Sequence, residues 1–237
     1  MGTDIEAVIF DWGGTLTPWH TIDTEALWLA VADELDPVNA AAVAAALAEA
    51  EALVWARARD EHRSGTLAEV AELANVIFTD PARAVYELGW EPHSLTDPQA
   101  PAVLLGLRER GIRVGVLSNT IWSREYHERI FARDGVLGLF DGAVYSSEIP
   151  WTKPHPEAFL AAVAATGATD PARCVFVGDR LFDDIYGARN VGMRAVFVPH
   201  SAVPPHQVGH TLGEPDATIH NLGELLPLVD SWRAGPP

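Results

Sequence analysis

The stretch Ala7-Val-Ile-Phe-Asp11-Trp-Gly-Gly-Thr15-Leu-Thr17 decides the fold of this chain. Its short apolar run, residues 7–10, ends abruptly at a carboxylate, which two glycines and a threonine follow. Such a run is typical of a buried parallel strand that leads into a tight loop. Ligands of open parallel sheets bind beyond the carboxyl ends of the strands, so Asp11 is a candidate for chemistry. The simpler alternative is that Asp11 caps a neighbouring helix.

Composition excludes several classes of protein. The chain has 237 residues, and 16 basic against 33 acidic residues give a formal charge of −17, which argues against nucleic acid and anionic membranes as partners. No apolar run reaches the roughly 18 residues of a membrane span, and the N-terminus lacks the basic segment of a signal peptide. Cys174 is the only cysteine, which excludes an internal disulfide. We therefore expect a cytoplasmic protein.

Outside residues 21–92 the chain alternates between strand and helix patterns. Strands are expected at 4–11, 112–117, 143–145, 174–177, 194–198 and 218–219. Helices are expected at 97–110, 123–133, 156–166, 181–191 and 222–229. This alternation predicts an α/β fold with a doubly wound, Rossmann-like parallel sheet.

Residues 21–92 carry no strand signal. Helices are expected at 23–35, 38–63, 66–77 and 80–88. The second of these is rich in alanine, the best helix former, and Thr66-Leu-Ala-Glu69 has the spacing of a capping box. We interpret 21–92 as a helical subdomain inserted into an α/β core made of residues 1–20 and 93–237.

Polar residues follow several of the predicted strands. They are Asp11, Ser118, Lys153, and Asp179 with Asp184. Taken singly, the serine and the aspartates could be helix caps and the lysine a solvated loop residue. Lys153, however, is the only lysine, whereas the other 15 basic residues are arginines. Carboxylates together with a backbone carbonyl suit Mg²⁺, and a lysine beside them stabilises anionic oxygens. The combination suggests phosphoryl transfer through an aspartyl-phosphate.

Four stretches follow one another along the chain: Asp11-Trp-Gly-Gly-Thr15, Val114-Gly-Val-Leu-Ser118-Asn119, Lys153-Pro-His-Pro-Glu-Ala-Phe159 and Val177-Gly-Asp179-Arg-Leu-Phe-Asp183-Asp184-Ile-Tyr-Gly187-Ala188. Together they resemble the motifs of the haloacid dehalogenase superfamily, and the resemblance covers nearly the whole length of the chain. The spacing within the fourth is specific. By this resemblance the helical insertion is a cap that closes over the site and sets substrate choice.

The resemblance also implies roles for individual residues. Asp11 would be the nucleophile, and Lys153 would neutralise the phosphoryl group. Thr15, Ser118 and Asn119 would hold that group. Mg²⁺ would be bound by Asp11, the carbonyl of Gly13, Asp179 and Asp184. The implied activity is hydrolysis of a small phosphorylated metabolite, with Mg²⁺ as cofactor.

One departure from the family pattern limits this hypothesis. Family phosphatases usually carry a second aspartate two residues after the nucleophile, where this chain has Gly13. That aspartate is the general acid and base, a function worth roughly 10²–10⁴ in rate. The protein could remain a phosphohydrolase if His20 or His62 supplied the proton, or if the substrate had a good leaving group such as an acyl phosphate. Ordinary loop and surface roles are the alternative for both histidines.

Two other branches of the superfamily also lack that aspartate. The phosphonate-cleaving branch needs a lysine in the cap, and residues 21–92 contain none. The carbon–halogen-cleaving branch needs no metal and typically has an aromatic residue at the position of Gly13, so the pair Asp179 and Asp184 argues against it. A catalytically degenerate protein that binds phosphate without turnover is the remaining alternative.

Overall fold

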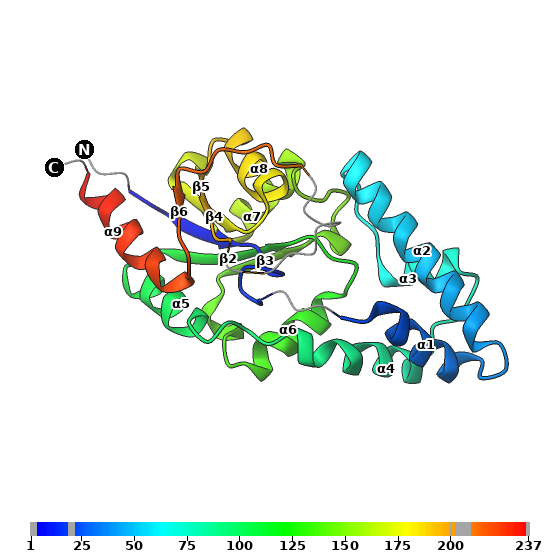
Figure 1. The fold of residues 1–237 in the computed structure, drawn as a ribbon. Coiled ribbons are helices and arrows are strands. Elements are labelled where there is room, and N and C mark those ends of the chain that lie inside the picture. The colour runs from blue at the N-terminus through cyan, green and yellow to red at the C-terminus, as the bar shows by residue number, and fades with distance from the viewer. Residues whose placement is uncertain (1–3, 19–21, 200, 202–209, 236–237) are drawn as a thin grey trace.

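The structure is a computed structural model that describes residues 4–18, 22–199, 201 and 210–235. Its centre is a six-stranded sheet with the strand order β3-β2-β1-β4-β5-β6 (Figure 1). The strands are β1 (Ala7–Phe10), β2 (Arg113–Ser118), β3 (Gly142–Tyr145), β4 (Cys174–Gly178), β5 (Arg194–Phe197) and β6 (Ala217–Thr218). All neighbouring strands are parallel, so the predicted doubly wound α/β fold is confirmed.

The quoted stretch forms the centre of the sheet. In β1, Ala7 pairs with Arg113 of β2 on one side and with Cys174 of β4 on the other. The strand order reverses between β1 and β4, which is the switch point where α/β sheets bind ligands. All four residues of β1 are buried, since helices cover both faces of the sheet.

Helices pack on both sides of the sheet. One face is covered by α7 (Pro156–Ala165) and α8 (Gly187–Asn190), and the other by α5 (Ala100–Glu109), α6 (Arg124–Arg133) and α9 (Leu225–Ala234) (Figure 1). Side chains of a strand alternate between the two faces. Val8 and Phe10 accordingly join the core under α5 and α6, whereas Ala7 and Ile9 join the core under α7.

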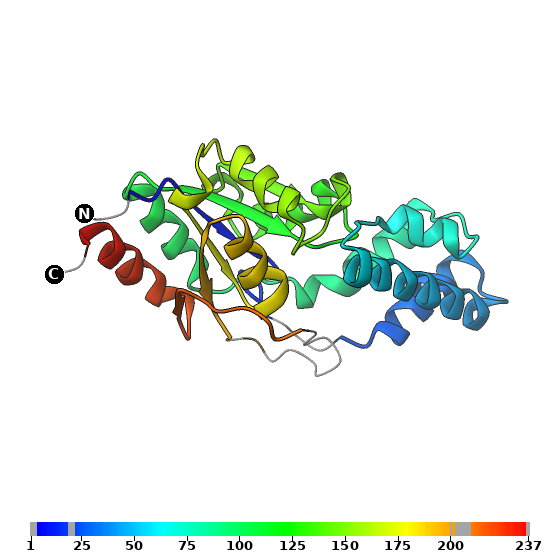
Figure 2. The same ribbon diagram turned by 90° about the horizontal axis from the view of Figure 1, so that it is seen from above.

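The remaining helices form a separate block beside the sheet (Figure 2). They are α1 (Thr24–Leu35), α2 (Ala40–Glu61), α3 (Leu67–Leu73) and α4 (Asp80–Trp90). In this block α2 packs on α1 and α3, and α1 also packs on α4. Thr66 caps α3 by accepting the N–H of Glu69, as the capping-box spacing predicts. Within the described ranges, no helix combines the length and the apolar character that a membrane crossing needs.

The segment after β4 differs from the helix that the sequence predicts at 181–191. It begins with a single wide π-type turn, η5 (Leu181–Tyr186), and only then continues as the short α8. The carbonyl of Arg180 accepts hydrogen bonds from the N–H groups of both Asp184 and Ile185. Such wide turns are frequent at functional sites. This one carries Asp184 on its buried side.

Candidate active site

A tight loop holds the backbone beyond β1. The N–H of Gly14 donates to the carbonyl of Thr17 over 2.7 Å, and the N–H of Thr17 donates to the carbonyl of Trp12 over 2.9 Å. Gly14 has a φ of +95°, and a Cβ at this position would collide with the carboxylate of Asp179. Only glycine combines this conformation with this close approach. The glycine-rich loop thus lets Asp11 and Asp179 share one site.

The single lysine joins two of the predicted carboxylates. Lys153 Nζ lies 2.5 Å from Asp11 Oδ1 and 2.7 Å from Asp184 Oδ1. All three side chains are buried. The other oxygen of Asp184 accepts the N–H of Arg180 over 2.8 Å. The polar residues predicted at the ends of the strands therefore lie together. Two short ion pairs hold Lys153 in place and offset the cost of removing its charge from water.

Asp179 is the exception in this cluster. Its side chain is only 1% exposed, and neither carboxylate oxygen has a hydrogen-bond donor among the described residues. Arg180 Nε, at 3.6 Å from Oδ2, is too far for a hydrogen bond. Oxygens of Asp11, Asp179 and Asp184 all lie within 4.8 Å of one another. Three buried carboxylates so close together are stable as ions only when a cation compensates their charge.

The pKa values reflect this crowding. Burial raises the pKa of Asp11 to about 6, because the loss of hydration outweighs the lowering effect of Lys153. Burial, and then the charges of Asp11 and Asp184, hold the pKa of Asp179 well above its usual range. Burial also raises the pKa of Asp183 to about 6. Burial alone would lower the pKa of Lys153, but the two carboxylates together outweigh it and raise the pKa.

Asn119 contacts the loop of residues 149–155, which carries Lys153 and is called the lysine loop below. Its Nδ2 donates to the carbonyl of Lys153 over 3.0 Å, and its Oδ1 accepts the N–H of the same residue over 2.8 Å. Both ends of the amide are therefore used to hold the backbone of Lys153. The sequence motif identified Asn119 as a site residue, but only the structure shows that it clamps the lysine.

The other predicted site residues lie at the end of β2 and on the loop beyond β1. Thr15 is fully buried, and its hydroxyl has no hydrogen-bond partner in the described part of the chain. Ser118 ends β2, buried, opposite Tyr145 of β3. Gly13 forms an isolated bridge with Thr17. One contact of the loop beyond β1 was not indicated by the sequence. Ser201 Oγ, from the segment after β5, donates to the carbonyl of Gly14 over 2.8 Å.

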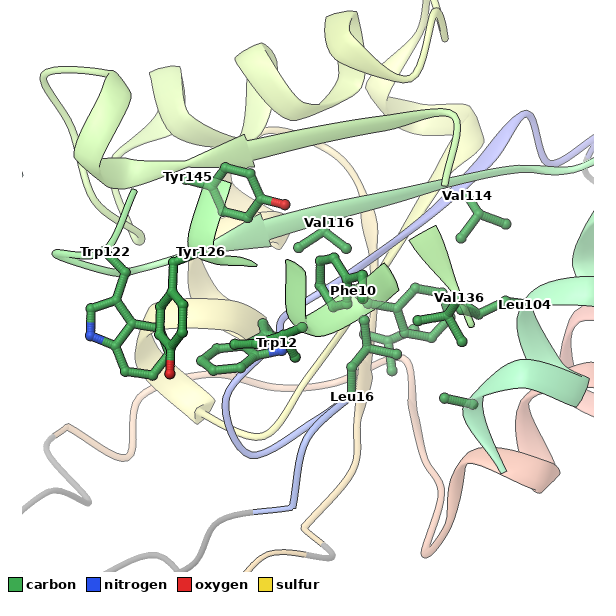
Figure 3. Close-up of a cluster of buried hydrophobic side chains, with 14 of the residues drawn as sticks. Phe10, Trp12, Leu16, Leu104, Val114, Val116, Trp122, Tyr126, Val136 and Tyr145 are labelled. Atoms are coloured by element: carbon green, nitrogen blue, oxygen red, sulfur yellow. The ribbon is translucent and has the colours of Figure 1, made fainter. Parts of the chain in front are cut away.

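Trp12, next to the nucleophile candidate, belongs to the apolar core and not to the polar cluster. Figure 3 shows Phe10 and Trp12 among the buried side chains of that core, with Trp122 and Tyr126 nearby. The rings of Trp12 and Trp122 meet edge to face, with centroids 5.2 Å apart. This packing anchors the loop on one face of the sheet, so that Asp11, one residue earlier, meets Lys153 on the other side of the backbone.

Of the two candidate proton donors, only one can be placed. His20 lies outside the described residues. His62 follows the last residue of α2, and its carbonyl accepts the N–H of Thr152 over 2.9 Å. It therefore lies across from the residue that precedes Lys153. On the same helix, Arg57 is paired with Glu69 through both of its terminal guanidinium nitrogens.

The buried carboxylates and Lys153 thus lie at the switch point of a parallel sheet, where α/β proteins bind their ligands. The family model of haloacid dehalogenase-like hydrolases matches residues 5–192, and the chain belongs to this family. The match covers all four sequence stretches that carried the resemblance.

Named relatives include several phosphatases. The chain is 37% identical over 101 residues to a glyceraldehyde 3-phosphate phosphatase from Methanothermobacter thermautotrophicus, which is 43% of each chain. It is 29% identical over 166 residues to a phosphoserine phosphatase from Thermus thermophilus, 70% of this chain and 60% of that protein. The chain thus spans less than two thirds of the length of these curated relatives.

Solved structures resemble the whole chain. A HAD phosphatase from Thermococcus onnurineus superposes with a TM-score of 0.66 at 25% identity, covering 97% of this chain and all of that one. An L-2-haloacid dehalogenase from Xanthobacter autotrophicus superposes with a TM-score of 0.64 at 20% identity, covering 96% of this chain and 99% of that one. The second likeness concerns the fold alone.

Proposed function

We propose that this protein is a Mg²⁺-dependent phosphohydrolase that acts on a small phosphorylated metabolite through an aspartyl-phosphate on Asp11. The observation that carries the proposal is the buried carboxylate of Asp179, which has no hydrogen-bond donor among the described residues and lies with Asp11 and Asp184 in a cluster 4.8 Å across. A phosphatase needs a cation at this place, whereas cleavage of a carbon–halogen bond does not.

The residues fit Mg²⁺. This ion prefers oxygen ligands, and one or two carboxylates with waters and substrate oxygens are its usual environment in phosphoryl-transfer sites. Asp11, Asp179 and Asp184 would hold it, together with the carbonyl of Gly13. When bound, the ion would compensate the carboxylates and polarise a phosphoryl oxygen.

The protein's own residues would perform the chemistry. A carboxylate oxygen of Asp11 attacks phosphorus and forms the acyl phosphate. Lys153, held in place by Asn119, balances the charge of the phosphoryl oxygens. The hydroxyls of Thr15 and Ser118 donate hydrogen bonds to those oxygens. The helical block 21–92 acts as the cap that excludes water and selects the substrate.

Gly13 is the observation that favours a second candidate, a degenerate protein that binds phosphate without turnover. A dehalogenase-like activity is the third candidate, since dehalogenases share the fold. Phosphonate cleavage is not a candidate, because it needs a lysine in the cap and residues 21–92 contain none. The relatives named as phosphatases favour the first candidate.

A substrate screen distinguishes these candidates. Wild type, Asp11→Asn and Gly13→Asp are compared on phosphate esters, acyl phosphates and 2-haloacids, each with MgCl₂ or EDTA. We expect Mg²⁺-dependent release of phosphate by the wild type, none by Asp11→Asn, and roughly tenfold or higher activity of Gly13→Asp on alkyl phosphates. Wild-type activity in Asp11→Asn would show that the nucleophile is misassigned. Binding of a phosphoryl mimic without hydrolysis would favour the degenerate protein, and metal-free dehalogenation the third candidate.

A further inference from the structure

His62 lies between two segments that carry the site. The backbone of residues 62–64 runs antiparallel to residues 150–152, with hydrogen bonds from Thr152 N–H to His62 O and from Ser64 N–H to Pro150 O. The next residue after Thr152 is Lys153. On the other side, the ring of His62 faces Phe182, with centroids 6.2 Å apart, and Phe182 belongs to the same turn as Asp184.

The conformation of His62 is unusual. It has a φ of 55°, in the left-handed region, and Asn75 is the only other described non-glycine residue with a positive φ. His62 is the C-terminal cap of α2, a place where many helices end in a left-handed residue, most often glycine. Non-glycine residues in the left-handed region cluster at active sites and ligand-binding segments.

The imidazole also has an unused buried atom. Nδ1 of His62 is buried and has no hydrogen-bond partner among the described residues. A buried polar atom without a partner costs free energy, unless a ligand supplies the partner. The two segments that His62 contacts also carry Lys153 and Asp184, so a ligand of this site is the candidate for that partner.

On the basis of the phosphohydrolase proposed above, we propose that His62 is the proton donor and acceptor that replaces the aspartate missing at Gly13. Its residue type suits the task, since an imidazole nitrogen can either donate or accept a proton. Its place on the helical block, joined to the lysine loop, puts it on the side of the site opposite the sheet, where the leaving group of a substrate attacked by Asp11 must lie.

The proton balance is complete with this one residue. When Asp11 bonds to phosphorus, the bond between phosphorus and the leaving oxygen breaks, and protonated His62 gives its proton to that oxygen. Neutral His62 then takes a proton from a water molecule as the water oxygen bonds to phosphorus. The bond between phosphorus and Asp11 breaks, phosphate leaves, and both residues return to their starting states.

Two substitutions test this without disturbing the fold. Glycine and asparagine both tolerate a positive φ, so His62→Gly and His62→Asn keep the backbone and remove the imidazole. We expect kcat on alkyl phosphates to fall about 10²–10³-fold. With p-nitrophenyl phosphate, whose leaving group needs no proton, a burst of nitrophenol equal to the enzyme concentration precedes slow turnover. Added imidazole restores turnover to His62→Gly but not to Asp11→Asn.

The matched control is Asn75→Gly, which makes the same kind of backbone change at the other positive-φ residue, just after the C-cap of α3. We expect it to keep wild-type kcat on every substrate. Full alkyl-phosphatase activity in both His62 variants overturns the inference. So does an equal loss on all substrates without imidazole rescue, because that is the signature of a structural role. A wild type that hydrolyses no phosphate at all overturns the proposed function, and this inference with it.

Discussion

Asp179→Asn should change stability and function in opposite directions. Asparagine keeps the shape of the side chain and removes its charge. We expect the variant to be more stable than the wild type in EDTA, to lose the stabilising effect of Mg²⁺, and to lose phosphatase activity. This combination is expected only of a carboxylate that binds a cation and destabilises the folded protein when the cation is absent.

The size of the effect follows from the geometry. The oxygens of Asp11, Asp179 and Asp184 lie within 4.8 Å of one another, and a pair of unit charges at that distance repels by about 3.5 kcal/mol at an effective dielectric constant of about 20. Lys153 and Arg180 offset part of the repulsion, so that about 2–3 kcal/mol should remain. At about 2–4 °C per kcal/mol for a chain of this size, the unfolding midpoint should rise by about 5–10 °C.

Thermal unfolding in EDTA and in MgCl₂ measures both parts. Mildly alkaline buffer is used, because the pKa of Asp179 is raised and the wild-type carboxylate must be ionised. At a Mg²⁺ concentration of about 100 times Kd, the wild type should gain about 2.7 kcal/mol and the variant nothing. Asp60→Asn, at a residue whose side chain is 64% exposed, is the control and should change stability by less than about 0.5 kcal/mol.

Two results would refute this reasoning. One is a lower unfolding midpoint of Asp179→Asn in EDTA, which would mean that the carboxylate is stabilised by contacts within the folded protein. The other is an unchanged response to Mg²⁺, which would place the cation elsewhere. Neither result can be caused by a general loss of packing, since asparagine and aspartate have the same shape.

Three further predictions concern the same cluster. Gly14→Ala should lower the free energy of unfolding in urea by more than about 3 kcal/mol. Gly135→Ala is the control, because Gly135 also has a positive φ but open space around it, and it should cost only about 1–2 kcal/mol. Equal costs would contradict the close approach of Gly14 to Asp179. Asn119→Ala removes both hydrogen bonds from Asn119 to the backbone of Lys153. We expect the free energy of unfolding to fall by about 1–3 kcal/mol and kcat to fall as well. An unchanged kcat would show that Asn119 is not needed to position Lys153. The third concerns pH: burial raises the pKa of Asp11 to about 6, so the folded protein binds more protons than the unfolded chain between about pH 4 and 6. In EDTA this group should therefore add about 2–3 kcal/mol of stability as the pH falls through that window, and Asp11→Asn should remove that part of the pH dependence in a series of urea titrations.

The sequence by itself determined the class of fold and the members of the cluster. Apolar runs such as 7–10 and 174–177, separated by helical segments, predict a parallel sheet, because each run must be covered on both faces. The carboxyl ends of parallel strands share one edge, so the sequence alone predicts that Asp11, Lys153 and Asp184 lie close together. Local patterns suffice for this, since strand periodicity and topology do not depend on the identity of distant partners.

Only the tertiary structure decided which side chains compensate one another. That Lys153 pairs with Asp11 and Asp184 but leaves Asp179 without a donor depends on the width of the η5 turn and on the close approach of Gly14. The contact between His62 and the lysine loop joins segments about 90 residues apart, and the sequence could only name that histidine as one of two candidates. Such ion pairs depend on how segments that are distant in the sequence are placed against each other. Differences of about one ångström decide whether a charge is compensated. No local sequence pattern encodes distances of this kind.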